Sequence, residues 1–318
     1  MASTGTVGRA GTELVGPDGT AQAAELLREA DLAMYEAKDR NGSCVQVFAP
    51  AMSQAVLRSA QLQQDLAQAL AAGQLWFALQ PIVDLRTGAS VGAEALLRWT
   101  HPTRGPIPPV EFVPIAEQTG LLIPIGRWVL REACAHAASW PTPAGGLPLT
   151  VAVNLSVCQL TDPTLVNDVI AALSDTGLEP ARLTLEITES LLVHDVSTVA
   201  TQLHRLKELG VRLAIDDFGT GYSCLAYLAQ FPVDILKIDR SFVVAMAGSS
   251  QAATLTEAVV RLAEFMHLQV IAEGIETSEQ LQHVPRPELP LRTWLRPGPA
   301  HPRPPVPHTP PPAPEPHP

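Results

Sequence analysis

The sequence lacks a long apolar run and any paired-cysteine motif. No stretch approaches the roughly 20 apolar residues that cross a bilayer, and the first residues have no apolar core of a secretion signal. The cysteines, Cys44, Cys134, Cys158 and Cys224, include no C-x-x-C pair and no zinc-like spacing with histidine. We therefore expect a cytoplasmic protein with reduced thiols and no membrane segment.

Basic residues are also scarce. The chain has 21 Lys and Arg against 32 Asp and Glu, which gives a formal net charge of −11. DNA and RNA are bound through clustered basic side chains, so this balance argues against either as a partner. It leaves open a small phosphorylated ligand held through metal ions. At 318 residues and 46% hydrophobic content, the chain has enough apolar residues for one large domain with an additional segment.

Short β-rich runs alternate with helical segments from residue 76 onward. The runs 76–85 and 89–99 flank a turn at Thr87-Gly88 and predict an antiparallel pair. Five further strands, each in a βα unit, are expected at 149–155, 182–188, 211–216, 233–239 and 269–274. This order predicts an α/β fold, a TIM-like (β/α) barrel whose first two strands are antiparallel.

The predicted barrel is one strand short of eight. Residues 285–318 contain 15 of the 30 prolines, and proline lacks the N–H that a central strand needs. We therefore expect a barrel domain at 51–284 without a closing strand, followed by a disordered proline-rich tail at 285–318. Residues 1–50 read as a helix and a short strand, too little to bury a core of their own.

Polar residues stand at the ends of six consecutive predicted strands. In chain order they are Glu94, Asn154, Glu186, Asp216 with Asp217, Lys237 with Asp239, and Glu273. The carboxyl ends of parallel strands meet at one edge of the sheet, so these groups are expected to form one site. Oxygen ligands suit Mg²⁺ or Mn²⁺, and two such ions can clamp a phosphodiester and activate a water. The alternative is a set of separate solvated strand ends and helix caps.

The segments around these residues resemble a known family. EALLRW at 94–99, FVPIAEQTGLL, VNLS, LEITES, IDDFGTGYSCL, LKIDRSFV and IAEGIET follow one another as in the EAL-domain family, the bacterial cyclic-di-GMP phosphodiesterases. The resemblance covers about residues 55–283. It implies hydrolysis of one phosphodiester of cyclic di-GMP to the linear dinucleotide. It also implies cyclic di-GMP as the partner and two Mg²⁺ or Mn²⁺ ions, and a homodimer is a further expectation.

The same resemblance assigns roles to residues of this chain. It implies catalytic roles for Lys237, Glu273 and Glu94, with Lys237 orienting the attacking water. The implied metal ligands are Glu94, Asn154, Glu186, Asp216 and Asp217. The implied substrate contacts are Gln80, Arg98, Asp239 and Glu276. Glu189 is the residue expected to position the DDFGTGY loop.

Both ends of the chain depart from a complete domain of this kind. ADLAMYEAKDRNG near the N-terminus resembles the C-terminal end of a GGDEF-type diguanylate cyclase domain, but the GGDEF motif does not occur, so cyclase activity is not expected. After IAEGIET no Gln-Gly-Tyr motif follows. Two alternatives to an active enzyme therefore stay open: an impaired module that binds cyclic di-GMP or a protein partner, and a partly folded fragment.

Overall fold

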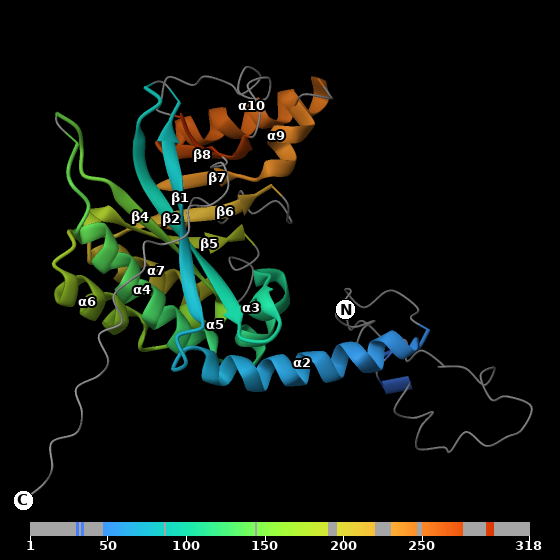
Figure 1. Ribbon diagram of the computed structural model, residues 1–318. Coiled ribbons are helices and arrows are strands. Elements are labelled where there is room, and N and C mark those ends of the chain that lie inside the picture. Colours follow the sequence, from blue (N-terminus) through green and yellow to red (C-terminus); the bar gives the residue numbers. More distant parts are fainter. Residues whose placement is uncertain are drawn as a thin grey trace, which may run out of the picture.

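The chain folds around one strongly curved β-sheet with helices on its outer face (Figure 1). The structure is a computed structural model. It describes residues 30–31, 33–34, 47–85, 87–143, 145–189, 196–219, 230–246, 250–275 and 291–295. Residues 1–29, 32, 35–46, 276–290 and 296–318 are outside this range, so the expectations for most of the N-terminal piece and most of the tail are untested.

Among the described residues the sheet has nine strands. They are β1 (Leu75–Asp84), β2 (Ser90–His101), β3 (Gly105–Ile107), β4 (Thr150–Leu155), β5 (Leu183–Thr188), β6 (Arg212–Phe218), β7 (Ile235–Ile238), β8 (Gln269–Ile275) and β9 (Leu291–Leu295). β1 and β2 pair antiparallel, and β2, β4, β5, β6, β7 and β8 follow one another in parallel. The α/β barrel with an antiparallel first pair is therefore confirmed.

The closing of the barrel requires a correction to the sequence prediction. β9 pairs parallel with β8 and antiparallel with β1, so Leu291–Leu295 does supply a strand between them. The high proline count of residues 285–318 concealed a proline-free window between Pro290 and Pro297 that contains β-favouring Thr and Trp. β9 bridges only part of the seam, because its pairing with β1 covers Ile82–Asp84 and stops two residues before Gln80.

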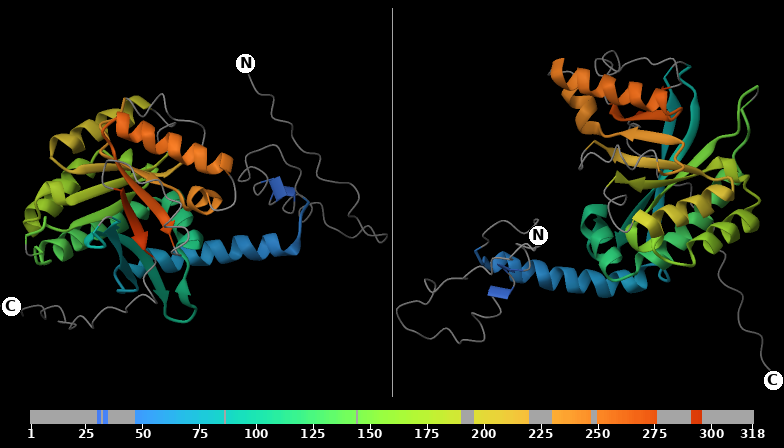
Figure 2. Two further views of the ribbon diagram at one scale, coloured as in Figure 1. Left: turned by 90° about the horizontal axis from the view of Figure 1, so that it is seen from above. Right: turned by 180° about the vertical axis from the view of Figure 1, so that it is seen from behind.

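Helices cover the outside of the sheet (Figure 2). They are α2 (Pro50–Ala69), α3 (Pro109–Gln118), α4 (Leu122–Ala138), α5 (Val157–Leu160), α6 (Leu165–Thr176), the 3₁₀ turn η1 (Pro180–Arg182), α7 (Val196–Glu208), α9 (Arg240–Met246) and α10 (Ser250–Phe265). Within the described ranges, no helix is both long enough and apolar enough to cross a membrane.

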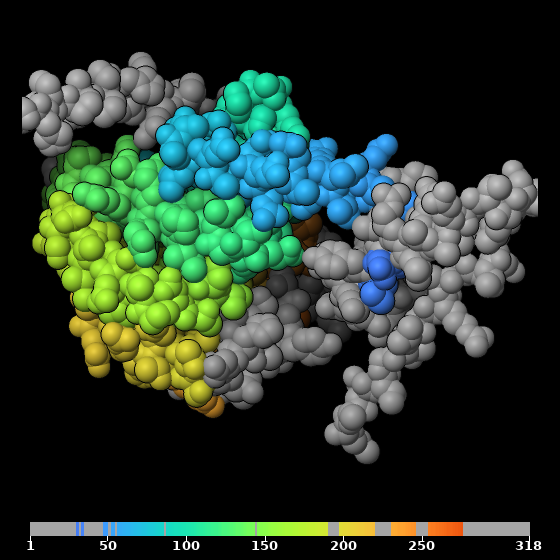
Figure 3. Space-filling view, turned by 90° about the horizontal axis from the view of Figure 1, so that it is seen from below, coloured from blue at the N-terminus to red at the C-terminus, as the bar shows by residue number. Residues whose placement is uncertain are grey.

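Helix α2 lies along one side of the barrel (Figure 3). Leu62, Leu66 and Ala69 on its C-terminal half are buried in the main core. In the middle of the helix, Arg58 forms an ion pair of 2.6 Å with Glu111 of α3. These contacts fix the orientation of α2 against the start of the barrel.

Two apolar layers support the site. The larger one fills the space between the sheet and the helices, because β4, β5 and β6 are apolar on the face that meets α4, α6 and α7. The smaller one fills the barrel interior and consists of Ile82, Ala152, Ala214, Ile235 and Ile271, one residue from each of five strands. Parallel barrels are packed in such layers, and the next layer toward the strand ends is the polar one.

Candidate metal centre

The polar layer lies two residues beyond the apolar interior layer. Strand side chains alternate between faces, so residues two apart point the same way. Asn154 follows Ala152, Asp216 follows Ala214, Lys237 follows Ile235, and Glu273 follows Ile271. Glu94 and Glu186 occupy the equivalent positions after Gly92 and Thr184. Since β1 runs in the opposite direction, its contribution, Gln80, lies two residues before Ile82 and opposite Glu94.

Lys237 is at the centre of this layer, with its side chain only 1% exposed. Its Nζ donates to Glu186 Oε2 at 2.7 Å and lies 2.8 Å from Glu273 Oε1. It is also 3.0 Å from Asp216 Oδ1 and 3.5 Å from Glu94 Oε2. One ammonium group therefore faces four carboxylates, all of which β-strands hold in place.

Asn154, on β4, lies next to Glu94 on the neighbouring strand β2. Its Nδ2 donates to Oε1 of Glu94, which joins the ends of two neighbouring strands. Glu94 is buried, whereas Asn154 is exposed at the open end of the barrel. The amide thus stands between the buried carboxylates and solvent.

A backbone irregularity brings two consecutive aspartates to the same site. In a regular strand Asp216 and Asp217 would point to opposite faces. The register between β6 and β7 shifts between Ile215 and Phe218, and Asp217 has φ of 52°, a left-handed conformation that aspartate tolerates better than most residues. Carboxylate oxygens of Asp216, Asp217 and Glu273 consequently lie within 4.8 Å of one another.

Glu189 contacts the chain that follows these aspartates. Its Oε2 accepts a 2.8 Å hydrogen bond from the backbone N–H of Gly219. Gly219 has φ of +99°, and a Cβ there would lie 2.5 Å from the Phe242 ring, so the turn needs glycine on both counts. The contact matches the loop-positioning role predicted for Glu189, which stays a prediction. Residues 220–229 of that loop are outside the described range.

The buried carboxylates have raised pKa values. Burial is the main cause in each case: it raises the pKa of Glu94, raises that of Glu186 further, and brings that of Glu273 to about 8. Lys237 opposes all three shifts. Burial alone would lower the pKa of Lys237, but the surrounding carboxylates, Glu186 foremost, raise it well above its usual value. The site thus has more negative charge than its single lysine neutralises.

This arrangement fits a divalent cation. Carboxylate oxygens of Glu94, Glu186 and Asp216 lie within 4.8 Å of one another, and Asp216, Asp217 and Glu273 form a second such group. Glu186 Oε1 is buried and has no hydrogen-bond partner among the described residues. A buried oxygen without a donor is costly, and a bound cation would satisfy it. Hard oxygen ligands of this kind suit Mg²⁺ or Mn²⁺.

The four predicted substrate contacts are less closely grouped. Gln80 is the cross-strand neighbour of Glu94. Arg98 lies further along β2, and its Nη1 donates to Leu97 O at 2.9 Å. Asp239 Oδ1 accepts from the Ser241 N–H at 2.9 Å, as a capping residue does at the start of α9. Glu276 is outside the described residues.

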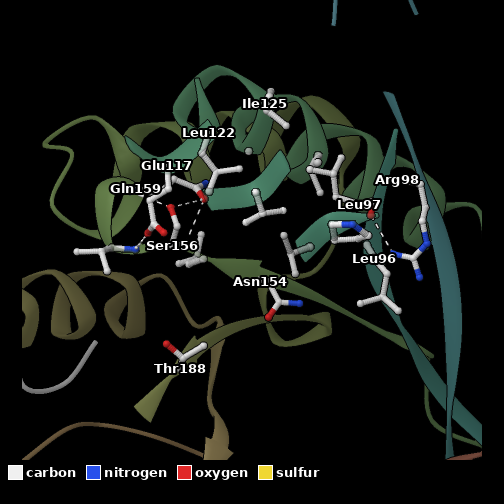
Figure 4. A pocket seen from close by; sticks show the side chains of 18 residues that line it. Leu96, Leu97, Arg98, Glu117, Leu122, Ile125, Asn154, Ser156, Gln159 and Thr188 are labelled. Atoms are coloured by element: carbon white, nitrogen blue, oxygen red, sulfur yellow. Dashed lines mark hydrogen bonds between the residues drawn. The ribbon is translucent and has the colours of Figure 1, made fainter. Parts of the chain in front are cut away.

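A cavity of about 420 Å³ opens beside the acidic layer, between the sheet and α3 to α5 (Figure 4). Its walls are mainly apolar, with Leu97, Ile125 and Val129 among them, while Arg98 and Asn154 belong to its polar part. The sequence prediction missed three polar residues at this cavity, Glu117, Ser156 and Gln159. The only local signal for them is the S-x-x-Q pattern of 156–159, a capping box.

The fold and the site together define a class of protein: an α/β barrel with an acidic, lysine-centred metal site at the carboxyl ends of its strands. A profile of the EAL domain matches residues 63–286. The chain belongs to the EAL domain family.

Two relatives and one solved structure illustrate the similarity. The chain is 44% identical over 264 residues to the bifunctional diguanylate cyclase/cyclic di-GMP phosphodiesterase MucR of Pseudomonas aeruginosa, which covers 82% of this chain and 38% of that protein. It is 41% identical over 265 residues to the cyclic di-GMP phosphodiesterase NbdA of the same species, covering 83% and 34%. The chain therefore spans between a third and two fifths of these relatives. A structure of the PaMucR phosphodiesterase in complex with c-di-GMP superposes with a TM-score of 0.68 at 43% identity, covering 74% of this chain and 95% of that one.

Proposed function

We propose that this protein is a metal-dependent phosphodiesterase that hydrolyses cyclic di-GMP to the linear dinucleotide. The observation that carries the proposal is the group of four carboxylates within 3.5 Å of Lys237 Nζ. Such a group suits a cation and a phosphate more than it suits a structural ion pair. The similarity to a phosphodiesterase whose structure contains c-di-GMP supports this choice of substrate.

The proposed cofactor is a pair of Mg²⁺ or Mn²⁺ ions. The residues that would hold them are Glu94, Asn154, Glu186, Asp216 and Asp217, and the two carboxylate groups share Asp216. Bound there, the ions would neutralise phosphate charge and lower the pKa of a water that attacks phosphorus.

The side chains of the protein would orient the reacting groups. In the proposed reaction the water oxygen bonds to phosphorus, one phosphorus–oxygen bond of the ring breaks, and a proton of the water is transferred to the leaving ribose oxygen. Lys237 would orient that water, because its Nζ is the donor at the centre of the layer. Burial raises the pKa of Glu273, which suits this carboxyl group to transfer that proton to the leaving ribose oxygen. Gln80, Arg98, Asp239 and Glu276 remain the proposed substrate contacts.

Binding of cyclic di-GMP or of a protein partner without turnover is the alternative. The main observation in favour of this alternative is the expected absence of a closing strand. The pairing of β9 with β1 and β8 weakens that support. The sequence of β9, LRTWL, still brings no glutamine or carboxylate to the seam. The alternative predicts the same affinity for cyclic di-GMP with no linear product.

The first experiment is an assay of cyclic di-GMP linearisation by the purified chain with Mn²⁺ or Mg²⁺. Glu94→Gln keeps the shape and burial of the side chain but removes its charge, and we expect turnover to fall at least about 100-fold. Glu111→Gln is the matched control, because Glu111 is a carboxylate on α3 whose partner is Arg58 rather than a site residue. Equal turnover in the wild type and in Glu94→Gln would overturn the proposal.

We also propose a domain arrangement, a location and an assembly. Residues 1–50 correspond to the end of a GGDEF-type domain, 51–284 to the EAL domain and 285–318 to a proline-rich tail whose described residues, Leu291–Leu295, form a strand. The similarity to MucR, a bifunctional diguanylate cyclase/cyclic di-GMP phosphodiesterase, supports the first assignment. The cytoplasm and a homodimer are proposed as well. Light scattering on the purified chain would test the dimer.

A further inference from the structure

Asn154 reaches the site from a very short connection. β4 ends at Leu155 and α5 begins at Val157, so only Ser156 separates strand from helix. The exposed Asn154 side chain has its described hydrogen bond to Glu94. Because little packs around this side chain, the backbone of the connection determines where its amide group lies.

A local hydrogen-bond network holds this connection from one side. Ser156 Oγ accepts from the Gln159 N–H at 3.4 Å, and Gln159 Oε1 accepts from the Ser156 N–H at 3.3 Å. Gln159 is buried, although it is a polar residue on a helix of only four residues. A short helix has little stability of its own, so its geometry depends on such contacts.

A second contact comes from a different helix. Glu117, in the last turn of α3, accepts a 3.2 Å hydrogen bond at Oε1 from the Val157 N–H, 40 residues further along the chain. Figure 4 shows Glu117, Gln159 and Ser156 gathered at one side of the cavity and Asn154 at its lower edge. The two backbone N–H groups that follow Leu155 are therefore both held by side chains.

Helix α4 fits closely over the same network. A Cβ on Gly126 would lie 2.0 Å from Gln159 Nε2, so no larger residue could occupy this position without moving the glutamine. Glycine inside a helix normally lowers its stability. Here it permits α4 to pack directly on Gln159 and to restrict its rotamer.

We infer that Glu117 and Gln159 are positioning residues for the metal centre, which hold the β4–α5 connection so that Asn154 remains against Glu94. The inference rests on the proposed function, because it assigns Asn154 to the metal. Neither residue touches the acidic layer in the described contacts, so each acts through the backbone. Residues that orient metal ligands typically change metal affinity by about 10- to 100-fold when they are removed.

The test measures Mn²⁺ affinity by calorimetry in three variants of the full chain. Glu117→Ala removes the acceptor, and we expect the Kd for Mn²⁺ to rise about tenfold or more. Glu117→Gln keeps a carbonyl oxygen at the same place and should stay within about threefold of the wild type. Glu111→Ala removes the same charge from the same helix and should leave the Kd unchanged.

Two further readings separate positioning from general destabilisation. Hydrogen exchange at the Val157 amide should accelerate in Glu117→Ala and not in Glu117→Gln, while the melting temperatures of all three variants stay close together. Saturating Mn²⁺ should restore the kcat of Glu117→Ala to within about threefold of the wild type. A Glu117→Ala protein that binds Mn²⁺ like the wild type would overturn the inference. Wild-type protein that binds Mn²⁺ but does not hydrolyse cyclic di-GMP would overturn only the proposed function.

Discussion

Two lysine–carboxylate clusters lie at opposite ends of β7 and differ in how their charges balance. Before the strand begins, Asp234 pairs with Lys207 of α7 at 2.6 Å and also accepts the Leu213 N–H at 2.9 Å. That pair is one to one and partly exposed. At the other end Lys237 is buried and faces four carboxylates. The first cluster is complete as it stands, whereas the second has an excess of negative charge that is suited to a bound cation.

Removing each lysine is the strongest way to test this difference. Lys237→Met leaves buried carboxylates without their cation, so we expect the free energy of unfolding without metal to fall by about 3–5 kcal/mol. We expect its turnover of cyclic di-GMP to fall by about 10³-fold, within the range for the loss of a hydrogen-bond donor that orients a reacting group. Urea unfolding and the linearisation assay measure the two effects.

Lys207→Met is the matched control at the other end of β7. Its ion pair is partly exposed, and such pairs contribute about 1 kcal/mol or less. Turnover should stay within about twofold of the wild type. Similar losses in the two variants would mean that the two clusters do not differ in function.

Metal binding should also distinguish the clusters at the two ends of β7, through a smaller change in the free energy of unfolding. With Mn²⁺ at about 100 times its Kd, the unfolding free energy should rise by about 2.7 kcal/mol. Glu186→Gln removes a buried ligand from the group it forms with Glu94 and Asp216 and should abolish most of this rise. Asp234→Asn should keep it. Thermal melting with and without Mn²⁺ gives the result, and a rise that survives in Glu186→Gln would contradict the ligand assignment.

Interrupting β9 should lower stability without changing the acidic layer. Thr293 pairs with Val83 of β1 and Ala272 of β8, so Thr293→Pro should remove ladder bonding and cost about 2 kcal/mol. Because the pairing with β1 stops before Gln80, the Kd for Mn²⁺ should change by less than about threefold. Ala313→Pro, in the proline-rich sequence, is the control. An unchanged denaturation midpoint in Thr293→Pro would contradict the pairing of β9 with β1 and β8.

The residues of the acidic layer could be predicted because strand periodicity places them. Asp216 and Lys237 follow the apolar strand residues Ala214 and Ile235 at a spacing of two, which is visible in the sequence. Asp217 is different, since a regular strand would turn it away from the site and only the irregularity in β6 brings it back. The sequence pattern therefore indicates the members of the layer but not their geometry.

The remaining features depend on contacts that are distant in sequence or on very short segments. Glu117 meets the N–H of Val157 across 40 residues, and no local pattern connects the two. β9 has five residues in a region where proline dominates the composition, so an average over that region hides it. Pairing on both sides, rather than its own propensity, makes this segment a strand.

The central lysine also bears on how the protein matures in a cell. A barrel whose carboxylates had no internal counter-ion would need metal at the moment its strands assembled, as zinc fingers do. Lys237 provides a cation that is part of the polypeptide and reaches all four carboxylates. We therefore expect the newly synthesised chain to be able to complete its barrel before it binds a divalent ion.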